Sequence, residues 1–116
     1  MNKLLILALL AGCAGSGFGD AVRKDITQTV GQSKDPIQGC YAARLKANRK
    51  LKGTIHVHIV AEAGTGKFSQ VKIRHDELGD PDLADCVVSE LEKLALTDKP
   101  KSNVEFDYPL AFSPTN

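Results

Sequence analysis

The first thirteen residues of the chain have the pattern of an export leader, and removal of that leader limits the sequence that can form a folded domain. Lys3 gives a short positive start, an apolar run from Leu4 to Leu10 follows, and the small residues Ala11 and Gly12 end it. This order is that of a secretory signal peptide. The run is too short to cross a bilayer, which takes about 20 apolar residues. We therefore expect residues 1–12 to be a signal peptide that is removed on export.

The end of this leader, Leu10-Ala11-Gly12-Cys13, resembles the lipobox of bacterial lipoproteins. The resemblance implies that Cys13 becomes the first residue of the mature chain and carries the lipid that holds it on a membrane. Ala14 follows instead of Asp, as in lipoproteins that are sent to the outer membrane. The expected location is the cell envelope, with the domain facing the periplasm. The alternative is an ordinary secretory signal followed by an unrelated cysteine.

Two further cysteines, Cys40 and Cys86, remain once Cys13 is assigned to the lipid. An even pair in an oxidising compartment predicts a disulfide. By chain entropy alone, a bridge over this loop would contribute about 4 kcal/mol. A zinc pair or a nucleophilic cysteine is the alternative, but neither cysteine lies in a CxxC pair or at ligand spacing from a histidine.

The composition argues against several classes of function. Without Lys3, the 15 basic side chains become 14 and balance the 14 acidic ones. Nucleic-acid binding rests on clustered Lys and Arg, so we expect no nucleic-acid partner. The serines have no nucleophile-elbow context, and Gly64-Thr65-Gly66 is interpreted as a turn and not as a phosphate loop. We expect no enzymatic activity and no cofactor.

Residues 13–34 are expected to be a flexible tether behind the lipid. Residues 14–19 are rich in glycine and other small residues, which is typical of a linker. Residues 20–34 are polar, with a weak apolar stripe at Val22, Ile26 and Val30. We interpret them as linker too, and place the folded domain at residues 35–114.

The folded domain is predicted to contain two helices. Asp35-Pro36 is a helix start signal, and Gly53 is expected to end this first helix. The apolar residues between them fall on one face at helical spacing: Ile37, Cys40, Tyr41, Leu45 and Leu51. Gly79-Asp80-Pro81 repeats the start signal, and the second helix is expected to run to about Ala95.

Alternating apolar residues predict three strands. Residues 54–63 and 67–75 flank the turn, and a three-residue loop places Val57 opposite Ile73 and Ile59 opposite Val71. In this register His75 lies on the apolar face. The last strand is expected at residues 104–112, where Pro109 indicates an edge or a bulge.

The element order predicts an α+β fold: helix-strand-strand-helix-strand, with both helices on one face of a small antiparallel sheet. Cys40 and Cys86 then lie on the inward faces of the helices, which makes a bridge geometrically possible.

The other face of the sheet is the candidate for binding. His56 and His58 lie two residues apart on that face, where they could reach one metal ion. Their predicted cross-strand neighbours, Arg74 and Lys72, oppose a cation and supply no third ligand, so we expect surface histidines and no metal site. Together with Lys67, these side chains form a mildly basic face that could meet anionic lipid, polysaccharide or an acidic protein.

The last strand offers a second candidate surface. Val104, Phe106, Tyr108 and Leu110 are expected to face the helices, whereas Glu105, Asp107, Pro109 and Ala111 are expected to face water. If this strand is an edge, the part before Pro109 has free backbone groups for a partner strand. Glu105 and Asp107 would discourage indiscriminate pairing.

Several short motifs resemble the AgmX/PglI C-terminal domain family of bacterial envelope proteins, which is related in shape to TonB C-terminal domains. They are Cys40-Tyr41, Leu51-Lys52-Gly53 with residues 54–59, residues 64–67, Leu83-Ala84-Asp85-Cys86-Val87, and Tyr108-Pro109-Leu110-Ala111-Phe112. The chain departs from the family pattern at Arg49-Lys50, Arg74-His75-Asp76 and Leu94-Ala95-Leu96.

The resemblance covers about residues 35–114 and supports the fold and the cysteine pairing. The family has no established enzymatic activity. We therefore expect a lipid-anchored binding or adapter domain whose partner is an envelope protein or a cell-wall polymer. A purely structural lipoprotein and a metal-handling protein that uses the surface histidines are the alternatives.

Overall fold

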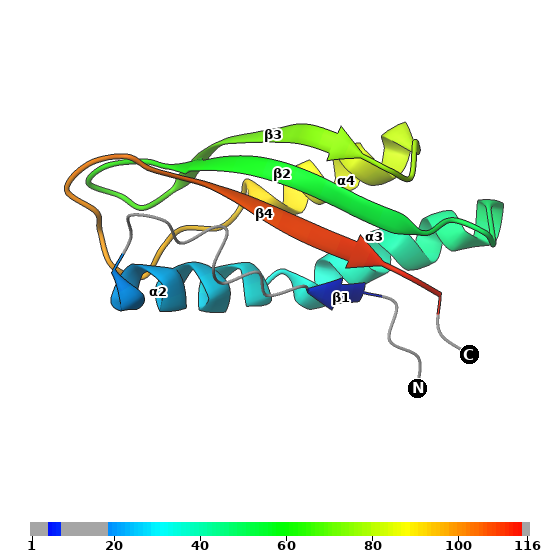
Figure 1. Ribbon diagram of the computed structural model, residues 1–116, viewed down its shortest axis with the longest axis horizontal. Helices are drawn as coiled ribbons and strands as arrows, with labels where there is room; N and C mark the ends of the chain where they lie inside the picture. The colour runs from blue at the N-terminus through cyan, green and yellow to red at the C-terminus, as the bar shows by residue number, and fades with distance from the viewer. Residues whose placement is uncertain (1–4, 8–18, 115–116) are drawn as a thin grey trace.

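The structure is a computed structural model that describes residues 5–7 and 19–114. Its elements, in chain order, are β1 (Leu5–Leu7), α2 (Asp20–Gly31), α3 (Lys34–Ala47), β2 (Gly53–Ala61), β3 (Phe68–Asp76), α4 (Pro81–Leu91) and β4 (Val104–Phe112). The strands form one antiparallel sheet in the order β1-β4-β2-β3. The helices lie on one face of that sheet (Figure 1). The predicted α+β class and its layering are confirmed.

The register of the β2–β3 hairpin is the predicted one over most of its length. Val57 pairs with Ile73 and Ile59 with Val71. The turn depends on glycine at Gly66, which has a φ of +75°. A Cβ there would lie 2.9 Å from the carbonyl oxygen of Leu96, which packs against the turn. The turn is therefore fixed against the chain that follows α4.

One irregularity changes the face on which a histidine lies. A register shift between His56 and Val57 places His75, and not Arg74, opposite His56. The extra residue in β3 reverses the alternation beyond this point. His75 is consequently exposed on the outer face, and its predicted place on the apolar face is wrong.

Helix α2 occupies most of the stretch that was expected to be linker. Ile26 is 4% exposed and Val30 is completely buried, so the apolar stripe packs into the core. The buried carboxylate of Asp25 accepts hydrogen bonds from the backbone N–H groups of Thr97 and Asp98, at 3.0 and 2.9 Å. The flexible-tether prediction is therefore wrong for residues 20–31. Residues 13–18 lie outside the described part of the chain.

The predicted helix ends were too late in both cases. Helix α3 ends at Ala47 because the Asn48 side chain accepts a hydrogen bond from the Lys50 N–H and turns the chain. Leu51 still reaches the core, where its carbonyl accepts a hydrogen bond from the Tyr41 hydroxyl. Helix α4 begins at Pro81 as predicted but ends at Leu91. Shortly after it, the Leu94 carbonyl accepts a hydrogen bond from the Phe68 N–H and the Leu96 N–H donates to the Gly66 carbonyl, which ties this stretch to the β2–β3 hairpin.

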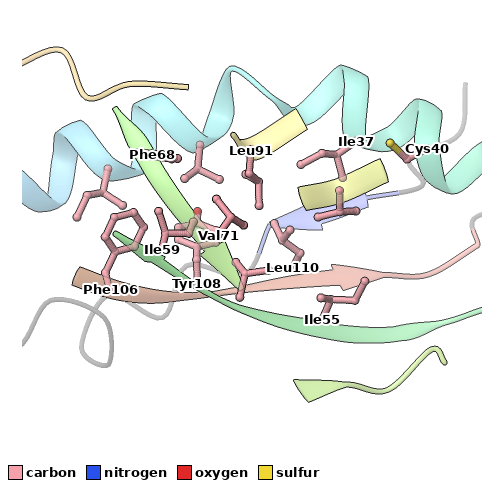
Figure 2. Close-up of a cluster of buried hydrophobic side chains, with 14 of the residues drawn as sticks. Ile37, Cys40, Ile55, Ile59, Phe68, Val71, Leu91, Phe106, Tyr108 and Leu110 are labelled. Atoms are coloured by element: carbon pink, nitrogen blue, oxygen red, sulfur yellow. The ribbon is translucent and has the colours of Figure 1, made fainter. Parts of the chain in front are cut away.

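A continuous apolar core fills the space between the sheet and the helices (Figure 2). Val104, Phe106, Tyr108 and Leu110 of β4 all face it, as predicted. Cys40 of α3 and Cys86 of α4 form a disulfide at its edge, with 5.9 Å between their Cα atoms and 46 residues between them in sequence. The predicted bridge is confirmed. It joins two of the three described helices covalently.

Candidate functional site

Every candidate binding residue that the sequence indicated on the strands lies on the face of the sheet that the helices leave uncovered. They are His56 and His58 on β2, Lys72 and Arg74 on β3, and Glu105 and Asp107 on β4. His75 joins them through the bulge. Because β4 pairs with β2 and not with β3, the two carboxylates come to lie beside the histidines.

His58 lies between the two carboxylates. Its Nδ1 is 2.7 Å from Oδ1 of Asp107, and its Nε2 is 3.1 Å from Oε1 of Glu105. Carboxylates only accept hydrogen bonds, so both contacts form together only when the ring carries both protons. The ring is 17% exposed. Both ring nitrogens of His58 therefore face carboxylate oxygens of β4.

The charge of this face is mixed, not basic. The Nε of Arg74 lies 3.9 Å from Oδ1 of Asp107. Glu105 carries a second negative charge, and it lines one open hollow together with Lys72. The predicted basic face took account of β2 and β3 only. The two carboxylates of β4 nearly balance the positive charge of this face, which weakens the case for an anionic partner here.

His56 and His75 lie side by side across the β2–β3 ladder. Their ring centres are 5.8 Å apart and the rings are tilted by 48°. Together with Arg74 and Asp107 they line an open hollow of about 450 Å³. The described residues include no cluster of three or more His, Cys, Asp or Glu arranged to hold a metal ion.

The outer edge of β4 is the second part of the candidate site. An antiparallel strand sends its backbone groups alternately to its two neighbours. Pro109 lies opposite His56 in an unbroken β2–β4 register. Because proline has no N–H, it fits at a position whose backbone groups point away from β2. By the same alternation, the N–H groups of Glu105, Asp107 and Ala111 point to the outer edge.

A short apolar strand covers only one end of this edge. Leu5, Ile6 and Leu7 of β1 pair with Phe112, Ala111 and Leu110. Among the described residues, no strand pairs with residues 104–109 on that side. The edge predicted from Pro109 is therefore present before the proline. The proline ring itself is buried and does not face water as predicted, because it lies inside the sheet opposite His56.

The remaining sequence predictions concern the anchor. Cys13 lies outside the described residues, while residues 5–7 belong to the leader that we expect to be removed. No helix in the described ranges combines the length and apolar character that a membrane span requires. Comparison of the chain with protein-family models, curated proteins and solved structures gives no match.

Proposed function

We propose that this chain is a lipid-anchored envelope protein whose domain binds an extended segment of a partner protein along the outer edge of β4. It performs no catalysis. The observation that carries the proposal is the antiparallel pairing of Leu5–Leu7 with this edge. The lipobox resemblance at Cys13 and the resemblance to the AgmX/PglI C-terminal domain family support the anchor and the binding role.

The β1 segment indicates the chemistry of the partner. Three consecutive apolar residues lie antiparallel on the edge and also contact α3. In strand addition, backbone hydrogen bonds give affinity and the alternate side chains give specificity. Removal of residues 1–12 takes this strand away and leaves the same backbone groups for another extended peptide. We therefore favour a protein partner over a cell-wall polymer, which has no such backbone.

The charged side chains beside the edge restrict what pairs there. Glu105 and Asp107 are exposed, and charged residues on an edge oppose indiscriminate strand pairing. The apolar end at Leu110–Phe112 has no such protection. The partner segment is accordingly expected to be apolar where it meets this end and neutral or basic where it passes the two carboxylates.

A peptide titration tests the proposal. The chain from residue 13 onward, carrying Cys13→Ser, is labelled with ¹⁵N and titrated with a peptide of residues 3–8, Lys-Leu-Leu-Ile-Leu-Ala. We expect saturable shifts of the amide of Ala111 and its neighbours on β4. Absence of saturable shifts there, in a chain whose spectrum is folded, would contradict the proposal.

A matched pair of variants identifies the edge. Ala111→Pro removes an N–H that points outward and, like Pro109, leaves the pairing with β2 in place. It should abolish peptide binding, whereas Ala111→Ser keeps the N–H and should bind normally. The reversal of Lys72 and Arg74 to Glu tests the competing outer face. Loss of binding with that reversal, but not with Ala111→Pro, would move the binding site to the outer face.

A further inference from the structure

We propose that His56 and His75 form a two-histidine binding site for a late first-row divalent ion, such as Cu²⁺, Ni²⁺ or Zn²⁺. This site is separate from the strand-binding edge and does not depend on it. It also differs from the pair that sequence spacing suggests, because His58 is engaged by Asp107 and Glu105.

The distance between the rings fits one shared ion. A metal ion bound to one nitrogen of each imidazole at about 2.0–2.1 Å holds the ring centres roughly 4.5 Å apart at a right angle and about 6.4 Å apart when linear. The centres of His56 and His75 are 5.8 Å apart. This separation falls between the two limits, so the two imidazoles are close enough to share one ion.

The β-bulge creates this pairing. Without the shift between His56 and Val57, Arg74 would lie opposite His56 and the site would contain one imidazole and one cation. With the shift, both histidines lie on the outer face of adjacent paired strands. The strands hold them together before any ion binds, which lowers the entropic cost of chelation.

The charges around the hollow permit a cation. Arg74 lines the hollow, but its Nε lies 3.9 Å from the Asp107 carboxylate, which lines the hollow as well. That carboxylate offsets the positive charge close to where an ion would lie. The objection raised by the sequence, that positive neighbours oppose a cation, is thus reduced by a carboxylate of β4, a strand whose position the sequence did not give.

Two protein ligands leave the other coordination positions to water or to a further ligand. His75 is exposed and the hollow is open, so the bound ion is exchangeable and accessible. Imidazole suits zinc, copper and nickel, and the general order of affinity places Cu²⁺ above Ni²⁺ and Zn²⁺. We expect one ion per chain, bound most tightly when it is Cu²⁺.

Metal titrations of the chain from residue 13 onward, carrying Cys13→Ser, test the site. The protein is prepared without a polyhistidine tag and with an acetylated N-terminus, so that neither competes for metal. Titration with CuCl₂, NiCl₂ and ZnCl₂ is followed by calorimetry. We expect one site, with affinity reduced at least tenfold by His56→Gln and by His75→Gln. His58→Gln, the matched control on the same strand, should bind at least as tightly as the unaltered chain.

Two results would overturn the assignment. Unchanged affinity in His56→Gln and His75→Gln would show that these rings do not hold the ion. A loss in His58→Gln as large as that in His75→Gln would place the ion between His56 and His58. Electron paramagnetic resonance of the Cu²⁺ complex adds an independent readout, with coupling to two imidazole nitrogens expected in the unaltered chain and to one in each single variant.

Discussion

Replacement of Asp25 by alanine should weaken the packing of α2 against the rest of the domain. Asp25 is 7% exposed, and its carboxylate accepts three hydrogen bonds, from the backbone of Thr97 and Asp98 and from the Thr29 hydroxyl. The two backbone hydrogen bonds join residues 72 and 73 positions apart. They hold the helix against the loop that follows α4.

The expected cost follows from these bonds. A hydrogen bond to a charged group contributes about 1.5–3 kcal/mol. Thr97 and Asp98 are exposed, so in the variant water can bond to their N–H groups and restore part of the lost free energy. We expect the free energy of unfolding to fall by about 2–3 kcal/mol in total, and the Tm to fall by roughly 10–20 °C. The measurement is urea and thermal unfolding followed by circular dichroism.

The same carboxylate predicts a dependence on pH. Burial by itself raises the pKa of Asp25, but the hydrogen bonds from Asp98, Thr97 and Thr29 outweigh it and hold the pKa below its usual value. The stabilisation is therefore complete above the unfolded pKa of about 3.9 and is lost as the pH falls through the folded value. The difference in stability between the native chain and Asp25→Ala should shrink accordingly in acid.

A matched variant in the same helix separates docking from helix propensity. Among the described residues, the exposed Asp20 pairs only with Arg23, one turn away, so Asp20→Ala should change stability by less than about 0.5 kcal/mol. If Asp25→Ala proved as stable as Asp20→Ala, or if its deficit did not vary between neutral and acid pH, the docking argument would be refuted.

Three further predictions concern the anchor, the bridge and a helix cap. Cys13→Ser should prevent lipidation, and mass spectrometry of the mature N-terminus checks this; cleavage elsewhere or an unmodified Cys13 would exclude the lipobox. Cys40→Ser or Cys86→Ser should cost about 2–5 kcal/mol in unfolding experiments, while free thiols at both positions in unreduced protein would contradict the bridge. Asp80→Ala removes the carboxylate that accepts from the Leu83 N–H at the start of α4 and from the Arg44 Nε of α3, and should cost at least about 1 kcal/mol in unfolding experiments, the loss expected for the cap alone.

Local patterns were enough to predict the hairpin and the last strand. The alternation around Val57 and Ile59 and the glycines of the turn fix one register, because a shift by one residue would expose every apolar side chain. The bounds of β4 follow from the same alternation. The start of α4 follows from Asp80 and Pro81, whose cap and first-turn roles are local.

Other features depend on contacts that no local pattern contains. The stripe of α2 is weak by itself, and the residues that stabilise it, Thr97 and Asp98, lie far along the chain. The bulge at His56 falls opposite Arg74-His75-Asp76, where three consecutive polar residues give no alternation to follow. The carboxylates beside His58 became evident only once β4 was placed next to β2.

The position of β4 also determines when the domain can fold. The last strand along the chain lies inside the sheet, between β1 and β2, and supplies four of the buried core side chains named above. A chain that emerges from the ribosome with its N-terminus first can form the hairpin early, but it cannot close its core until residues 104–112 have emerged. Such long-range pairing forms slowly. The topology thereby makes completion of the core depend on a strand that is synthesised after the helices and the hairpin.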